Sequence, residues 1–301
     1  MNIESLVLIA GCLVLGWVVA HVAKPPPALA QHLNWWVINI ALPALVMQLI
    51  PQVQFNAHLW FLPITMWLVF VGGWSFAVVL GKAFHWTRAR IGAVALSAGL
   101  GNTALVGFPL IEALRGHEAL PLAAFTDQLG CSIALAVGGI TVAALYSGSK
   151  PEPRVIVRRV LLFPAFIGLL LGFIAAAFGG WPKVIDMFVG RIGATLTPVA
   201  LFSIGLQFTL RIDRSGLGAA ALAMGWKLVI APVIIYALAV AFGLSGLVLT
   251  VPVLQAAMPP MVSTAILAAQ YNLDKDVATM ALGAGLLISL ATVPFLGNLL
   301  P

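Results

Sequence analysis

Long apolar runs, separated by short polar or charged connections, dominate this chain of 301 residues. Runs of about 20 apolar residues are long enough to cross a bilayer as helices. Ten such segments can be placed, at 5–22, 33–50, 59–81, 90–111, 119–146, 156–178, 184–209, 216–243, 246–271 and 276–299. The pattern predicts an all-α polytopic membrane protein with ten transmembrane helices.

The composition supports this prediction, because 62% of the residues are hydrophobic and only 8% are charged. An ordinary soluble domain carries about a quarter charged residues. The formal net charge of +6 comes from basic residues scattered between the apolar runs, not from a stripe with interleaved aromatic residues. Nucleic-acid binding is therefore excluded as a function class. The two cysteines, Cys12 and Cys131, each lie inside an apolar segment and are predicted to be buried thiols.

The basic residues also predict an orientation. Eleven of the fifteen Lys and Arg residues lie in the connections after the odd-numbered segments, namely Lys24, Lys82, Arg88, Arg90, Lys150, Arg154, Arg158, Arg159, Arg211, Arg214 and Lys275. The opposite side of the membrane, where the connections after the even-numbered segments lie, has three basic residues, Arg115, Lys183 and Arg191. Because cytoplasmic loops are enriched in Lys and Arg, we expect both termini to face outward. The first segment follows Glu4 and precedes the first basic residue, so we expect a retained helix, not a signal peptide.

The basic connection at 150–159 divides the chain into two sets of five segments. An odd number of helices in each half inserts the halves in opposite directions, which predicts an inverted repeat of 1–149 and 150–301 within a single membrane domain. The second segment contains Pro43 and Gln48, and the seventh, its counterpart, contains Pro198, Ser203 and Gln207.

The fourth segments of the two halves are the least able to stay helical. The first contains Gly101-Asn102-Thr103 and Gly107-Phe108-Pro109, and the second contains Gln255 and, four residues later, Pro259-Pro260. Proline removes a donor and clashes with the preceding turn, and irregular backbone at membrane depth survives only in a protein interior or beside a polar cavity. We therefore expect these segments to break and cross at about 101–109 and 255–261, at a transport site. The alternative is ordinary kinking, because Gly and Pro are common in membrane helices.

The candidate site follows from this crossover. Opened amides and the positive ends of half-helices would hold a carboxylate. The candidate substrate-binding side chains are Asn102, Thr103, Gln255, Ser203, Gln48 and Gln207. The candidate crossover or hinge residues are Gly101, Gly107, Pro109, Pro259, Pro260, Pro43 and Pro198. Asn102 has an alternative role as a cap of the half-helix, because asparagine is a favoured capping residue.

Two ionisable residues, Asp127 and Lys227, lie inside predicted spans. Such residues are energetically unfavourable in a membrane and usually face a partner or a polar cavity. One hypothesis is that they tune transport, either through a change of charge during the cycle or because Lys227 attracts the anion. The alternative is a static buried pair, or two unconnected residues that each reach other polar groups.

Other chemistry is not indicated. The five histidines are His21, His32, His58, His85 and His117. They lie near segment ends without metal-ligand spacing or a neighbouring nucleophile, so we expect no enzyme activity, metal or cofactor. The sequence contains no phosphate-binding glycine-lysine loop of the kind that ATP-driven transport needs. We therefore expect a gradient to drive the movement of substrate. The small-residue motif formed by Gly168 and Gly172 could form a homodimer, although packing within one protomer is favoured.

Several motifs resemble the auxin efflux carrier family of transporters, in its bacterial type. They are Asn39-Ile40-Ala41-Leu42-Pro43-Ala44-Leu45, the first crossover segment, Phe202-Ser203-Ile204-Gly205-Leu206, and Met258-Pro259-Pro260 with Ala269-Gln270-Tyr271-Asn272-Leu273. The resemblance implies two inverted repeats of five helices with helices 4 and 9 crossing at broken centres, a scaffold bundle and a mobile transport bundle. The chain departs from the family pattern at Ala104 and Leu105, where a glycine and an aromatic residue are usual.

Residues and resemblance together predict a secondary active transporter that moves a small organic anion, such as a carboxylate, by alternating access across a bacterial inner membrane. One alternative is a sodium-coupled symporter of the bile-acid type, although Asp127 is the one acidic residue available at depth for a sodium site. The other is a non-transporting receptor or scaffold, which has no need of irregular backbone at the midplane.

Overall fold

The computed structural model describes residues 3–26, 28–150, 152–207 and 216–301, and this part of the chain is all-helical. The helices of the first half are α1 (Ile3–Val22), α2 (Ala28–Trp36), η1 (Val37–Ala41), α3 (Leu42–Leu49), η2 (Ile50–Gln52), η3 (Ala57–Trp60), α4 (Phe61–Ala83), α5 (Arg88–Gly99), α6 (Gly107–Arg115), η4 (His117–Ala119), α7 (Leu120–Thr126), η5 (Asp127–Ser132), η6 (Ala134–Gly139) and α8 (Ile140–Ser147). Those of the second half are α9 (Pro153–Leu161), α10 (Pro164–Ala177), α11 (Lys183–Gly193), α12 (Leu196–Gln207), α13 (Leu217–Gly225), η7 (Trp226–Ile230), α14 (Ala231–Ala241), α15 (Gly246–Ala256), α16 (Val262–Gln270) and α17 (Lys275–Leu299).

Six helical stretches of the described chain are long and apolar enough to cross a membrane. They are Ala28–Gln52, Ala57–Ala83, His117–Ser147, Lys183–Gln207, Leu217–Ala241 and Lys275–Leu299. The pair α9 and α10, bent by 55°, makes a seventh when counted as one span. The prediction of an all-α polytopic membrane protein is thereby confirmed. Helices also occupy part of each of the remaining predicted segments, and the count of ten spans and the inverted repeat stay predictions.

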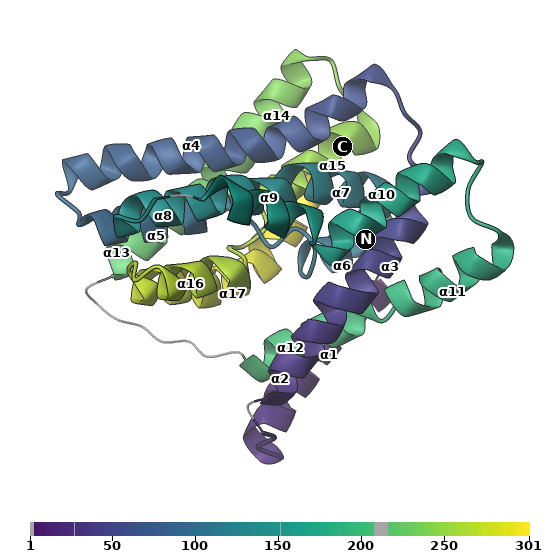
Figure 1. The fold of residues 1–301 in the computed structure, drawn as a ribbon, viewed down its shortest axis with the longest axis horizontal. Coiled ribbons are helices and arrows are strands. Elements are labelled where there is room, and N and C mark those ends of the chain that lie inside the picture. The colour runs from purple at the N-terminus through teal and green to yellow at the C-terminus, as the bar shows by residue number, and fades with distance from the viewer. Residues whose placement is uncertain (1–2, 27, 151, 208–215) are drawn as a thin grey trace.

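The helices form two groups (Figure 1). In the first bundle, α1 packs on α12, α12 on α2, and α3 on both α10 and α11. In the second bundle, α5 packs on α4, α8 and α17, while α17 also packs on α13 and α16. The short helix α7 joins the bundles, because it packs on α4 and α15 in one and on α3 in the other.

Glycines let α1 and α12 approach closely in the first bundle. A side chain at Gly16 would lie against the backbone oxygen of Phe202, and its Cβ would be 3.0 Å from the Cα of Gly205. A Cβ at Gly205 would in turn be 3.1 Å from the Cα of Gly16. Without a hydrophobic driving force between helices in lipid, such close backbone contact supplies much of the packing attraction.

The Gly168 and Gly172 motif also packs inside the chain. A Cβ at Gly168 would be 2.7 Å from the carbonyl oxygen of Pro43, and one at Gly172 would be 2.8 Å from the Cβ of Ile50. Both glycines of α10 therefore face α3 and η2. The motif therefore packs helices within one protomer, which is the alternative to a homodimer contact.

We expect Gly16→Ala to destabilise the protein, because its methyl group would meet backbone atoms of α12 that cannot rotate away. Overpacking of this kind typically lowers the free energy of unfolding by about 1–3 kcal/mol. Gly11→Ala is the matched control, because it lies on the same helix with no atom within 4 Å of its Cβ position. Thermal unfolding of the purified protein in detergent should show a lower melting temperature for Gly16→Ala alone. Equal melting temperatures for the two variants would contradict the close contact.

Candidate functional site

The first break in the helices lies between α5 and α6. The helix α5 ends at Gly99, Leu100 is extended with φ −112° and ψ 119°, and α6 begins at Gly107. Glycine has a low helix propensity, and the Asn102 side chain stabilises a turn instead, because its Oδ1 accepts a hydrogen bond of 3.2 Å from the Leu105 amide. The Gly107 amide then donates to the Asn102 carbonyl at 3.0 Å, which closes the turn before α6.

The second break lies between α15 and α16. The helix α15 ends at Ala256 and α16 begins at Val262. Pro259 and Pro260 have no amide hydrogen, so two consecutive donors of a continuous helix are missing. Pro252, by contrast, is accommodated inside α15.

The two breaks contact each other directly. Gly101 and Pro260 form an isolated antiparallel β-bridge, and the Asn102 amide donates a hydrogen bond of 2.7 Å to the Pro259 carbonyl. Each segment thus supplies partners for polar backbone groups that the other exposes. The predicted interruptions are confirmed, at 100–106 and 257–261.

The other proline positions behave differently. Pro43 directly follows the first residue of α3, after the π-helical turn η1, and the stretch Ala28–Gln52 stays helical through it. Pro198 lies in the first turn of α12 and Pro109 in the first turn of α6. Proline is tolerated in a first turn, because the missing amide has no helical acceptor there. Each of these prolines therefore lies inside a helix, but Pro198 comes just after the break at 194–195 between α11 and α12, and Pro109 just after the break at 100–106. Their role as hinges stays a prediction.

Gln255 connects the two halves of the crossover. Its side chain is fully buried, and Nε2 donates to the Ala123 carbonyl of α7 at 3.3 Å. Its Oε1 has no hydrogen-bond partner and lies 3.2 Å from the position that a Cβ of Gly107 would occupy. A buried acceptor without a donor is unfavourable by about 1–3 kcal/mol, which makes this oxygen a candidate ligand-binding atom.

A set of hydrogen-bonded side chains around Asp127 joins the first break to the π-helical turn η5. The Thr103 hydroxyl donates to Asp127 Oδ1 at 2.5 Å. Asp127 Oδ2 accepts from Gln128 Nε2 at 2.6 Å and from the Ser132 hydroxyl at 3.4 Å. Asp127 is only 2% exposed, so these three donors replace water around its carboxyl group.

Lys227 belongs to η7, and its side chain lies against the first break at Gly101. Its side chain is 1% exposed, and both Cε and Nζ are 2.7 Å from the position of a Cβ on Gly101. The absence of a side chain at Gly101 therefore makes room for the ammonium group. No hydrogen bond or ion pair joins this ammonium to the part of the chain that the structure describes, and Asp127 is not within 4.0 Å of it. The two residues thus do not form the static buried pair.

Both ionisable residues occupy π-helical turns. Asp127 is the first residue of η5, and Lys227 is the second residue of η7. Such turns are rare and occur frequently at functional sites. The apolar pattern predicts that both residues lie inside helices, but it does not predict π geometry there.

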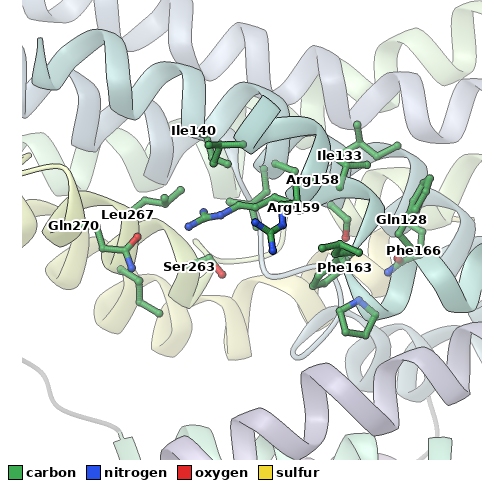
Figure 2. Close-up of a pocket in the computed structure, with 18 residues that line it drawn as sticks. Gln128, Ile133, Ile140, Arg158, Arg159, Phe163, Phe166, Ser263, Leu267 and Gln270 are labelled. Atoms are coloured by element: carbon green, nitrogen blue, oxygen red, sulfur yellow. The ribbon is translucent and has the colours of Figure 1, made fainter. Parts of the chain in front are cut away.

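A cavity of about 600 Å³ adjoins this network (Figure 2). Its walls come from η5, η6 and α8, from α9 and α10, and from α16. Gln128 and Ser132, both bonded to Asp127, line it. Arg158 and Arg159 also line it, and sequence reasoning used these two residues only for orientation. The described residues contain no cluster of three His, Cys, Asp or Glu side chains that could hold a metal ion.

Three of the predicted site residues have partners in the first bundle. The Ser203 hydroxyl donates to Asn34 Oδ1 at 2.8 Å, between α12 and α2. Gln207 donates to the Ser203 carbonyl at 3.1 Å, and Gln48 of α3 lies against Gly190 of α11. The structure therefore brings Asn102, Thr103, Gln255, Asp127 and Lys227 to the crossover, while Ser203, Gln207 and Gln48 make contacts between helices of the first bundle.

Comparison with known proteins places this geometry in context. The profile of a family described as membrane transport protein matches residues 1–296. An uncharacterized transporter of Methanothermobacter thermautotrophicus is 24% identical, covering 97% of this chain and 96% of its own length. A Rhizobium meliloti protein provisionally named a malonate transporter is 25% identical, covering 94% and 91% of the two chains. Auxin efflux carrier component 3 of Arabidopsis thaliana is 27% identical over 46% of this chain and 22% of its own length.

We expect Asn102→Ala to lower the free energy of unfolding by about 1 kcal/mol, because the Leu105 amide loses its acceptor. Asn102→Asp keeps an acceptor at the same position and should retain more of this stability. Thermal unfolding of both purified variants measures the difference. A melting temperature of Asn102→Ala equal to that of the unsubstituted protein would show that the amide does not stabilise the turn.

Proposed function

We propose that this chain, which belongs to the auxin efflux carrier family of membrane transport proteins, is a secondary active transporter that moves a small organic anion by alternating access. The substrate class is a carboxylate, and the name of the Rhizobium meliloti relative makes malonate the first compound to test. The setting is a bacterial inner membrane with both termini outside. The substrate would bind at the crossover of α5–α6 and α15–α16.

The observation that carries this proposal is the unpaired ammonium of Lys227 beside Gly101. A buried charge without a partner is strongly unfavourable, and removal of one partner from a buried ion pair typically destabilises a protein by about 3–5 kcal/mol. A bound carboxylate would supply the missing negative charge. An anion is therefore the ligand that this site favours most.

Hydrogen-bonding groups around the ammonium would fix the carboxylate. Asn102 uses Oδ1 for the Leu105 amide, so Nδ2 remains as a donor. The first amides of α16 lack a side-chain cap and carry the positive end of that half-helix, whereas the Gly107 and Phe108 amides of α6 already donate to backbone carbonyls. Gln255 Oε1 would accept a hydrogen bond from a substrate hydroxyl or a protonated second carboxyl.

The two bundles suggest how access would alternate. The crossover belongs to the second bundle, and the cavity beside it is bounded by α10 of the first bundle. Sliding of the second bundle against the first would close this cavity and open a route on the other side. The connection that contains α9 is cytoplasmic by the distribution of basic residues, so this cavity would face the cytoplasm.

Asp127 would then act as a group whose charge differs between states. Its carboxyl is held by Thr103, Gln128 and Ser132, so a shift of the first break would change its hydrogen bonds. A carboxyl that loses these donors favours the protonated form. Proton coupling through Asp127 is one route by which a gradient would drive transport.

Uptake by proteoliposomes tests the function. Purified protein would be reconstituted with imposed voltage, proton or sodium gradients and assayed with radiolabelled malonate, malate, succinate and acetate. We expect saturable uptake of at least one carboxylate. Strict dependence on sodium would favour the sodium-coupled symporter, and no uptake of any compound under any gradient would favour a non-transporting receptor.

We expect Lys227→Met to abolish transport while the protein stays folded, because the variant removes an unpaired buried charge and keeps the length of the side chain. Asp127→Asn should change the pH dependence of transport, and the double variant should resemble Lys227→Met. Asn102→Asp, which keeps the turn, should also lose transport because Nδ2 is replaced. Uptake and thermal unfolding are measured in parallel for each variant.

Two results would contradict this assignment. Normal transport with unchanged pH dependence in both single variants would remove Lys227 and Asp127 from the mechanism. Unfolding of both single variants with recovery of folding and transport in the double variant would instead show that the two residues only fix the fold.

A further inference from the structure

A basic helix forms one wall of the cavity. The helix α9 has the sequence Pro-Arg-Val-Ile-Val-Arg-Arg-Val-Leu, contains no buried residue and packs against η6. Arg158 and Arg159 line the cavity together with Val155 and Val160 of the same helix. Figure 2 shows both guanidinium groups extending into the space between Ile140 on one wall and Ser263 on the other.

The rest of the lining leaves this positive charge uncompensated. No Asp or Glu is among the residues that line the cavity. Neither guanidinium is paired with a carboxylate in the described ranges, where the ion pairs are Arg90 with Asp274 and His117 with Glu112. The polar groups opposite are neutral and come from Ser263 and Gln270 of α16 and from Gln128 and Ser132 of η5. The cavity therefore has two positive charges, four neutral polar side chains and otherwise apolar walls.

Guanidinium groups bind carboxylates through two parallel hydrogen bonds, which adds geometric selectivity to charge attraction. A cleft lined by one sign of charge, with walls of low dielectric, also concentrates counter-ions and raises their rate of association. Gln128 and Ser132 connect the cavity to Asp127, and Asp127 to Thr103 at the first break. An anion held at the arginines would thus be one polar layer away from the crossover.

We propose that Arg158 and Arg159 form a separate anion-binding site at the cytoplasmic mouth of the cavity, which captures an organic carboxylate before it reaches the crossover. This inference rests on the proposed function, since the captured anion is the transported one. The site sets the affinity for substrate from the cytoplasmic side, whereas Lys227 holds the anion at the crossover.

The same chemistry is offered by an anionic lipid headgroup. The helix α9 exposes Val157 and Leu161 beside its arginines, as helices at a membrane surface do. The test therefore separates a free carboxylate from a lipid phosphate.

Binding is measured apart from transport. Equilibrium binding of radiolabelled malonate, succinate and acetate is determined on the full chain in nanodiscs of neutral phosphatidylcholine. We expect the double variant Arg158→Gln, Arg159→Gln to bind at least tenfold more weakly than the unsubstituted protein. Arg154→Gln is the matched control, because it lies on the same helix but does not line the cavity, and it should bind within twofold of the unsubstituted protein. The double variant with lysine at both positions should recover part of the affinity, because it keeps the charge without the planar fork.

Unchanged binding in the glutamine double variant overturns the proposal, as does absence of binding by the unsubstituted protein. In nanodiscs with one third phosphatidylglycerol, binding that falls severalfold in the unsubstituted protein but not in the glutamine double variant assigns the arginines to lipid and also overturns it. Arginine-dependent binding without uptake in proteoliposomes would support this site while the proposed transport function fails. Uptake with normal affinity in the glutamine double variant would support transport and reject the site.

Discussion

The hydrogen bond from the Asn102 amide to the Pro259 carbonyl, with the bridge between Gly101 and Pro260, is the contact on which the rest of this structure depends. Backbone groups at membrane depth must find partners within the protein, because lipid offers none. Each of the two interrupted segments exposes such groups, and each satisfies some of those on the other. Their pairing therefore brings two irregular segments, about 150 residues apart in the sequence, into one place.

This pairing also decides where the buried ionisable groups lie. Thr103, in the first break, contacts Asp127, and Gly101, in the same break, leaves space for the Lys227 side chain. The carboxyl of Asp127 has three donors, whereas the ammonium of Lys227 makes no hydrogen bond or ion pair within the described ranges. This asymmetry is the physical basis for the proposed anion site, because a stable fold does not favour an unpaired buried cation. The same asymmetry separates the two residues from a static ion pair.

Close packing and open space are distributed unequally around the crossover. Within the first bundle, α1 and α12 meet through Gly16 and Gly205 with backbone atoms in contact, which resists relative movement. Next to the crossover, by contrast, a cavity of about 600 Å³ is bounded by η5 and η6 of the second bundle and by α9 and α10. Tight contact inside a bundle and empty volume beside it are what a rigid-body movement between bundles needs.

The sequence by itself determined that the chain is helical and where two of its predicted spans break, but not the bend between α9 and α10. Hydrophobicity and proline act locally, so the apolar runs, Pro259-Pro260 and the glycines around Asn102 were sufficient to predict helical segments and the two interruptions. The tertiary structure decided which side chains meet there. Ser203 and Gln48 look equivalent to Gln255 in sequence, since all three are polar residues in apolar helices, yet they contact the first bundle. Lys227 beside Gly101, and Arg158 and Arg159 in the cavity, likewise depend on the rotation and bending of helices far apart in the chain. A periodic pattern fixes the face of a helix but not its neighbour, because the neighbour is chosen by packing over the whole molecule.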